Sequence, residues 1–209
     1  HRVARRLATA VAVHVAAVEV TLAERSAEAL PLAVGRIADL QDHAVAAGRL
    51  DEAAREAAWG RLGGTVDLAS LADCDLVLSA LGSDEDDELL LFSDLGTILR
   101  PGAILACGND AVELTGLCAV TGRADTTIGL RIAAAGRLAE VAVPASAGPA
   151  TVATGVALAQ RLGRIAVVTG PDAGGLATRL RRALWIACSA LLEQGATPSS
   201  VDRALFDRA

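Results

Sequence analysis

Lysine, methionine and tyrosine are absent from this chain, and phenylalanine and tryptophan occur only twice each. The absence of lysine excludes Schiff-base and other lysine-dependent chemistry, because every basic side chain is one of 19 arginines. With 53% hydrophobic residues among 209, the core must consist mainly of Ala, Val, Leu and Ile, whose small side chains suit close packing of helices on a sheet. The composition predicts one sizeable globular domain, or one domain and part of a second.

Charge and cysteine spacing exclude several kinds of partner. A net charge of −6 disfavours nucleic acid, since phosphate binding needs a basic face. The four cysteines lie far apart without any C-x-x-C pair, so we expect no metal site and interpret them as buried thiols of a cytoplasmic protein. Arg2, Arg5 and Arg6 before the apolar run 7–18 imitate a signal peptide, but no small-residue cleavage site follows. No apolar run reaches the ~18 residues of a membrane span.

Short apolar runs alternate with helical patterns along the chain. This alternation predicts an α/β fold with a doubly wound parallel sheet of the Rossmann type. A helical period covers residues 30–47, Asp51 is a candidate cap for a helix over 52–61, and a long helix is expected over 175–193, with another starting at Thr197-Pro198-Ser199. The expected strands are Val18–Ala23, Asp75–Ser79, Ala103–Cys107, Thr126–Leu130, Ala139–Val143 and Arg164–Thr169.

The dense acidic run at 84–88 has two interpretations. A carboxylate cluster could hold a divalent cation, but Ser83 followed by Asp86 is also a capping-box pattern that places acids at the positive end of a helix dipole. We favour a helix start, because a metal cage needs ligands from more than one direction.

Several segments of the chain form a recognisable set: Thr65-Val66-Asp67-Leu68, Asp75–Ala80, Gly122-Arg123, Ile128-Gly129, and Gly175 with Arg179-Leu180. Together they resemble the NAD-binding domain of the 3-hydroxyacyl-CoA dehydrogenase family. The resemblance implies a Rossmann domain over residues 1–171 and the first helices of an all-helical C-terminal domain over 172–209. It also places the opening strand and first glycine before His1, between Val18–Ala23 and Asp75–Ser79. If that strand is absent, a central slot exposes unpaired backbone groups, which is costly unless something fills it.

The resemblance implies NAD as cofactor, but the residues that would hold it are altered. No Gly-x-Gly-x-x-Gly turn occurs. Ala4 takes the third glycine position, or Arg6 in a gap-free alignment. Glu24 takes the position of the ribose-binding acid, although a solvated carboxylate at a strand end explains it equally well. We therefore expect weak or absent NAD binding. The cofactor-binding positions implied are Ala4, Glu24, Ala80, Leu81 and Asn109.

The catalytic positions that the resemblance implies are mostly replaced. Arg131 stands where the family has its catalytic histidine, and a guanidinium does not give up its proton, so it cannot act as a general base. Ala111 takes the position of the substrate-orienting serine, and Thr178 that of the substrate-contacting asparagine. Glu140 alone keeps its type, as the acid that orients the missing base, and it could pair with Arg131 instead.

Two further features of the sequence concern a strand end and the histidines that could replace the missing base. Ser79 stands where the family has a glutamate at a strand end. His14 and His43 lie on expected helices away from the sheet edge, so neither is expected to replace the missing base.

These substitutions favour a catalytically degenerate domain, a pseudoenzyme module or a truncated part of an acyl-CoA-processing protein. One alternative is an active NAD-dependent 3-hydroxyacyl-CoA oxidoreductase whose glycine loop lies upstream of the chain. Another is an acyl-CoA or acyl-carrier binding module without redox activity, with a pocket lined by Ala111, Ala133 and Ala134. The expected ligand is then an acyl-CoA-type small molecule, and the resemblance implies a homodimer formed through the C-terminal helices.

Overall fold

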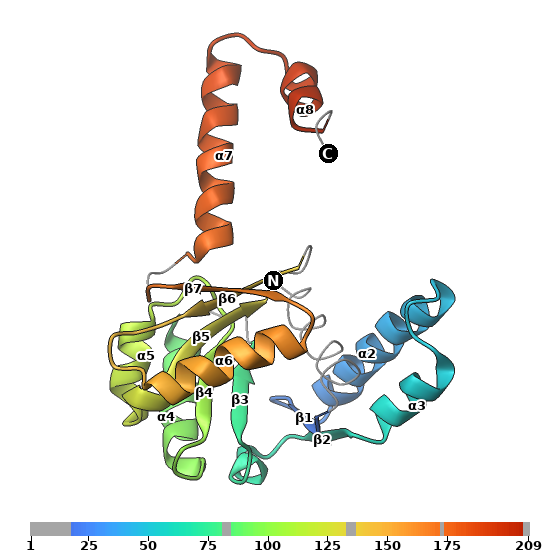
Figure 1. The fold of residues 1–209 in the computed structure, drawn as a ribbon, viewed down its shortest axis with the longest axis vertical. Coiled ribbons are helices and arrows are strands. Elements are labelled where there is room, and N and C mark those ends of the chain that lie inside the picture. The colour runs from blue at the N-terminus through green and yellow to red at the C-terminus, as the bar shows by residue number, and fades with distance from the viewer. Residues whose placement is uncertain (1–17, 81–84, 133–136, 172–173, 207–209) are drawn as a thin grey trace.

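The computed structural model describes residues 18–80, 85–132, 137–171 and 174–206, which form strands, covering helices and a projecting helical arm (Figure 1). The expected alternation of strands and helices is confirmed. The strands are β1 (Val20–Ala23), β2 (Leu62–Thr65), β3 (Leu76–Ser79), β4 (Ile104–Cys107), β5 (Thr127–Ile132), β6 (Leu138–Ala142) and β7 (Ile165–Thr169). The α-helices are α2 (Ala29–Ala46), α3 (Glu52–Trp59), α4 (Glu85–Ile98), α5 (Leu114–Thr121), α6 (Pro149–Arg161), α7 (Leu176–Glu193) and α8 (Pro198–Phe206).

Among the described residues the strands form two sheets. β1 and β2 pair in parallel, with Val20 opposite Leu62. The larger sheet has the order β3-β4-β5-β6-β7. No described strand joins β1 to β3, so among the described strands β1 pairs with β2 alone and β3 with β4 alone. The ion pair between Arg25 and Asp87, 2.9 Å long, links the end of β1 to α4.

The larger sheet is parallel, as predicted, except at one strand. β6 runs antiparallel to β5, with Arg131 opposite Glu140, whereas the other pairs of the larger sheet are parallel. Ile132 and Leu138 are separated by too few residues for a crossover, which needs about a dozen, so the chain can only turn back on itself. The sequence also failed to predict β2, whose Gly63 and Gly64 are poor strand formers.

Both faces of the larger sheet are covered, and the strand side chains alternate between them. Leu105 and Cys107 of β4 pack with Phe92 and Leu95 of α4 and with α5, while Ile104 and Ala106 pack with Ala159 of α6. β4 is therefore buried on both sides, which explains its continuous apolar run. This two-sided covering is the doubly wound arrangement that the sequence predicts.

The helix boundaries follow the expected local signals. The Asp51 carboxylate accepts a hydrogen bond from Ala54 N at 2.7 Å and caps α3, which ends at Trp59, two residues before the predicted end. Thr197 Oγ1 accepts from Ser200 N at 3.3 Å at the start of α8. α4 begins with four acids, but Ser83 lies outside the described residues.

Arg123, in one of the segments shared with the family, ends α4 from a distant part of the chain. Its guanidinium donates to the carbonyl oxygens of Gly96, Leu99 and Arg100 at 2.7–3.1 Å. These carbonyls have no partner within the helix, so a planar cation stabilises them by hydrogen bonding and by its position at the negative end of the dipole. Arg123 therefore fixes α4 against α5 from the loop after Gly122.

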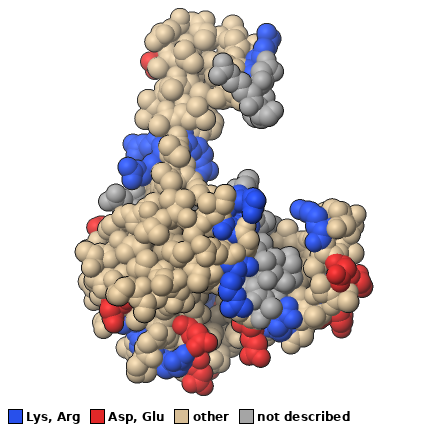
Figure 2. All heavy atoms as spheres, viewed as in Figure 1, with Lys and Arg blue, Asp and Glu red and all other residues tan. Residues whose placement is uncertain are grey.

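Helices α7 and α8 project from the sheet as an arm (Figure 1). α7 has no buried residue, and Leu180, Leu184, Trp185 and Ile186 are each between 49% and 67% exposed. Figure 2 shows arginines gathered where α7 leaves the sheet, which are Arg179, Arg181 and Arg182. No described helix combines the length and the hydropathy of a membrane span.

Candidate functional site

The expected catalytic positions lie together where the carboxyl ends of β4 and β5 meet β6 and the start of α7. Antiparallel pairing sets Arg131 of β5 directly opposite Glu140 of β6. The turn after β4 carries Asn109, Asp110 and Ala111. Thr178 approaches this turn from the first turn of α7. The structure thus assembles the four residues predicted from the sequence around one edge of the sheet.

Arg131 and Glu140 form the predicted ion pair inside the protein. Arg131 Nη1 lies 3.3 Å from Glu140 Oε1, and the two side chains are 7% and 5% exposed. Cross-strand neighbours of opposite charge attract, and here little water remains to screen them. The position of the family histidine therefore holds a buried cation with a carboxylate partner.

The Glu140 carboxylate has two further donors. Thr169 Oγ1 of β7 donates to Oε1 at 2.7 Å, and the backbone N–H of Leu176 donates to Oε2 at 2.7 Å. Leu176 is the first residue of α7, so a carboxylate of the sheet satisfies one of the free N–H groups of this helix. Both oxygens of Glu140 are engaged, and the residue anchors α7 as well as Arg131.

Gly175 lies against this ion pair and allows the close approach of α7. Its φ of +49° is in the left-handed region, and a Cβ there would lie 2.8 Å from Glu140 Oε2 and 3.3 Å from Arg131 Cδ. The resemblance included Gly175, but the sequence did not predict that the residue lies against the Arg131–Glu140 pair.

The substrate-orienting positions are engaged by the protein itself. Thr178 Oγ1 donates to the carboxylate of Asp110, and Gly174 N donates to the Asp110 carbonyl oxygen at 2.5 Å. Ala111 is exposed, and its N–H donates to Asn109 Oδ1 at 3.0 Å. Sequence reasoning missed Asp110 and Thr169, since neither replaces a family residue with a predicted role.

This arrangement holds a fixed positive charge at the position of the family base. The guanidinium only donates, and the one buried carboxylate beside it already accepts three hydrogen bonds. His43 does not replace the base, because it is exposed on α2 and its Nδ1 lies 2.5 Å from Asp39 O of the same helix. His14, Ala133 and Ala134 lie outside the described residues.

Only some of the cofactor-binding positions that the resemblance implies lie among the described residues. Glu24 follows β1, Ala80 follows β3, and Asn109 follows β4, as the sequence predicts, while Ala4 and Leu81 lie outside the described residues. Asn109 is 6% exposed, and its side-chain oxygen is occupied by Ala111 N. A cavity of about 940 Å³ separates β1 from β3, where the strand leading to a pyrophosphate-binding turn would lie. The described residues therefore do not make a complete dinucleotide site.

A second buried polar group lies at the end of β3 and was not expected from the sequence. Ser79 Oγ donates to Glu88 Oε2 at 2.6 Å, and the two residues are 5% and 0% exposed. The sequence indicated a family glutamate lost at position 79, and placed Glu88 only in an acidic helix start. A carboxylate reaches this strand end after all, from the first turn of α4.

Cys107 at the end of β4 is held neutral by its surroundings. Burial, followed by the nearby Glu88 carboxylate, raises the pKa of its thiol to about 12 from an ordinary value near 9. The thiolate is the nucleophilic form of cysteine, so burial disfavours the reactive form of this residue at neutral pH.

The same shift predicts a loss of stability in alkaline solution. Between about pH 9 and 12 the unfolded thiol loses its proton while the folded one keeps it, so the free energy of unfolding falls as pH rises. No lysine or tyrosine titrates in this range. We expect urea unfolding curves to show a weaker alkaline loss in Cys107→Ala than in the matched Cys188→Ala variant. Equal losses in both variants would contradict the assignment to Cys107.

Comparisons with known proteins agree on one family. The family profile described as 3-hydroxyacyl-CoA dehydrogenase, NAD binding domain, matches residues 3–173. The chain is 29% identical over 146 residues to the peroxisomal bifunctional enzyme of Danio rerio, covering 68% of this chain and 20% of the relative. It is 32% identical over 116 residues to a 3-hydroxybutyryl-CoA dehydrogenase of Mycobacterium tuberculosis, covering 55% and 41%. The chain thus spans less than half of these relatives.

Solved structures give the same result. The crystal structure of M. tuberculosis FadB2 superposes with a TM-score of 0.88 at 27% identity, covering 96% of this chain and 72% of that one. The (S)-3-hydroxybutyryl-CoA dehydrogenase PaaH1 of Ralstonia eutropha superposes with a TM-score of 0.86 at 25% identity, covering 94% and 70%.

Proposed function

Since the chain belongs to the 3-hydroxyacyl-CoA dehydrogenase family, we propose that it is a catalytically degenerate member, a non-catalytic domain of an acyl-CoA-processing protein. The observation that carries this proposal is Arg131, a buried cation at the position of the family base. Oxidation of a 3-hydroxyl group needs an acceptor for the hydroxyl proton, and a guanidinium provides none.

The state of Glu140 supports the same conclusion. Accepting a proton would neutralise this carboxylate and so weaken its interactions with Arg131, Thr169 and Leu176, including a contact that holds the start of α7. The groups that would orient a substrate hydroxyl are also absent or engaged, because Ala111 has only a methyl group and Thr178 donates to Asp110. Binding of an acyl-CoA-type ligand without redox chemistry remains compatible with these contacts.

The cofactor end supports weak or absent NAD binding. Glu24 follows β1, where the family has its ribose-binding acid, but the described residues supply no glycine turn through which a helix N-terminus could approach the pyrophosphate. Without that backbone approach, the bound dinucleotide would lose its main anchor.

The test is turnover by the full chain. We expect no NADH absorbance with NAD and 3-hydroxybutyryl-CoA, since loss of the base alone removes about 10²- to 10⁴-fold in rate and loss of positioning adds to it. Arg131→His alone should not restore activity, because Ala111 still stands at the position of the substrate-orienting serine. Robust turnover by the unmodified chain, abolished in Glu140→Gln, would show that the proposal is wrong.

Association through the C-terminal helices accompanies this proposal. The apolar residues exposed along α7 favour a partner helix, and a second copy of the chain is the proposed partner. Sedimentation of the full chain against Trp185→Glu tests it: we expect a dimer that the added charge converts to a monomer.

A further inference from the structure

Asp110, in the turn after β4, presents a carboxylate at the edge of the candidate site. Its backbone carbonyl oxygen accepts a hydrogen bond from Gly174 N at 2.5 Å, and its Oδ2 accepts one from the hydroxyl of Thr178 in the first turn of α7. The residue after Gly174 is Gly175, which lies against the buried ion pair of the site. The start of α7 therefore contacts both the Asp110 carboxylate and this ion pair, so the two belong to one site.

One oxygen of the Asp110 carboxylate is anchored and the other is open. Thr178 Oγ1 donates to Oδ2 and accepts from Arg181 Nη2 at 3.2 Å, so two partners hold this hydroxyl in place. Among the described residues nothing donates to Oδ1. Asp110 is half-buried, so part of the residue is accessible to a ligand. An ionised carboxylate only accepts hydrogen bonds, and Oδ1 is therefore available to a donor group.

The negative charge of Asp110 is not cancelled by an ion pair. Arg131 pairs with Glu140, and no ion pair among the described residues includes Asp110. Arg181 is exposed, so water screens its charge, and it donates to the Thr178 hydroxyl instead of the carboxylate. This edge of the site therefore attracts a hydrogen-bond donor and repels the partial negative charge of a carbonyl oxygen.

The positions beside Asp110 do not offer a ligand the same choice of hydrogen bonds as the family residues. Ala111 has only a methyl group, and its N–H donates to Asn109 Oδ1 at 3.0 Å. The Thr178 hydroxyl already donates to Asp110. The serine and asparagine that the family has at these two positions can donate as well as accept. The turn after β4 thus presents an acceptor where the family presents groups of both kinds.

We propose that Asp110 determines which acyl ligands the site takes: Oδ1 accepts a hydrogen bond from a donor on the third carbon of the acyl chain, a hydroxyl or an amino group, and disfavours a 3-oxo group. This rests on the proposed function, because it takes an acyl-CoA-type ligand to approach Ala111 and Thr178. It involves no proton transfer, since the ligand only donates a hydrogen bond. A protonated amine gives the stronger, charge-assisted bond, so a 3-amino group should bind more tightly than a 3-hydroxyl group.

The first measurement needs no variant. The full chain is titrated by calorimetry with four thioesters that differ only at the third carbon: 3-aminobutyryl-CoA, 3-hydroxybutyryl-CoA, butyryl-CoA and acetoacetyl-CoA. We expect Kd to rise in that order. 3-Hydroxybutyryl-CoA should bind about tenfold or more tightly than acetoacetyl-CoA, because a hydrogen bond to a charged group is stronger than one between neutral groups. Equal affinities for these two thioesters would overturn the proposal.

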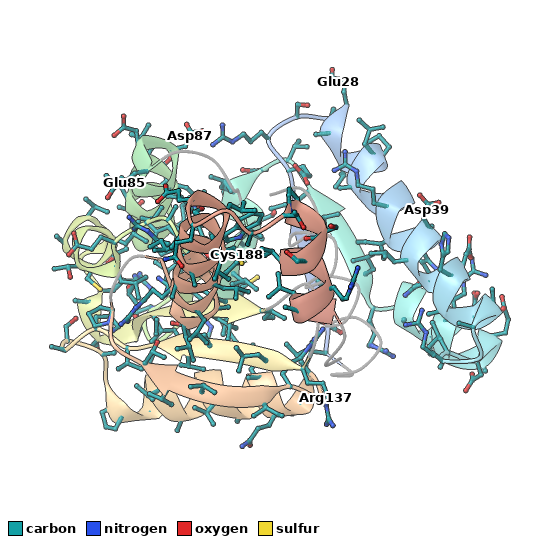
Figure 3. All side chains as sticks on the ribbon, turned by 90° about the horizontal axis from the view of Figure 1, so that it is seen from above. Glu28, Asp39, Glu85, Asp87, Arg137 and Cys188 are labelled. Carbon is teal, nitrogen blue, oxygen red and sulfur yellow. The ribbon has the colours of Figure 1, made fainter. Side chains whose placement is uncertain are left out.

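Asp110→Asn tests the carboxylate itself. The amide can keep its oxygen toward Thr178 and present its N–H₂ group to the ligand, so the tenfold ratio should fall to about threefold or less. Asp39→Asn is the matched control, because it makes the same change of charge on α2, which lies apart from α7 with Cys188 (Figure 3), and it should leave the ratio unchanged. If Asp110→Asn weakens all four thioesters by the same factor, Asp110 only holds α7 in place and the proposal is wrong.

The same titrations separate this proposal from the proposed function. If all four thioesters bind alike, Asp110 does not choose among them, and the proposed function is unaffected. If none binds, the ligand class in the proposed function is wrong, and the specificity of Asp110 with it. NADH formation from 3-hydroxybutyryl-CoA would contradict the proposed function alone, since the order of affinities does not depend on turnover.

Discussion

Glu140→Gln should lower the free energy of unfolding by about 3–5 kcal/mol, the usual cost of removing one partner of a buried ion pair. The substitution leaves the Arg131 guanidinium, 7% exposed, without its carboxylate. It also replaces one of two acceptor oxygens by an N–H₂ group, so either Thr169 or Leu176 loses its acceptor. Urea unfolding at neutral pH measures the effect.

Two control variants separate burial from charge. Asp42→Asn makes the same acid-to-amide change in the 2.6 Å ion pair with Arg55, whose side chains are 56% and 28% exposed, and should cost less than about 1 kcal/mol. Arg131→Met in the Glu140→Gln background removes the buried positive charge that no longer faces a carboxylate at position 140, and should recover part of the stability. If Glu140→Gln lowers the free energy of unfolding no more than Asp42→Asn does, water reaches Arg131 and the Arg131–Glu140 pair is not effectively buried.

The sequence predicted the alternating elements and their covering helices because these depend on local apolar periods. The sequence did not predict the elements whose formation or direction depends on segments that are neighbours in space but not in the chain. β2 contains two glycines and forms because β1 offers it a parallel edge. β6 reverses its direction because the connection after β5 is short, which a list of apolar runs does not show.

Some contacts of the candidate site could be predicted from the sequence, and others could not. The Arg131–Glu140 pair could be predicted because both residues replace or keep family positions that lie together. The contact of Glu140 with Leu176 spans 36 residues, and that of Thr178 with Asp110 spans 68. Both depend on how α7 meets the sheet, and so does the anchoring role of Glu140. Ser79 and Glu88 are a second example. The strand has Ser79 where the family has a glutamate, and Glu88 of α4 supplies a carboxylate at the same strand end.

Close packing of α4 against the end of α5 gives the second large effect. Gly96 lies in α4, and a Cβ there would overlap the carbonyl oxygen of Thr121 and lie 3.0 Å from its carbonyl carbon. Because the obstacle is backbone, no side chain can rotate away and the two helices must separate. Arg123, which donates to Gly96 O, would be displaced as well.

We expect Gly96→Ala to lower the free energy of unfolding by about 1–3 kcal/mol, the usual range for overpacking, with the loss of the Arg123 contacts adding to it. Gly35→Ala is the matched control, because Gly35 also lies within a helix but a Cβ there meets nothing within 4 Å. It should stabilise the protein by about 0.5–1 kcal/mol, since alanine favours the helix over glycine. Opposite signs for the same substitution in urea unfolding would show that the α4–α5 approach requires glycine, whereas stabilisation by both would show that α4 can move away from Thr121 at little cost.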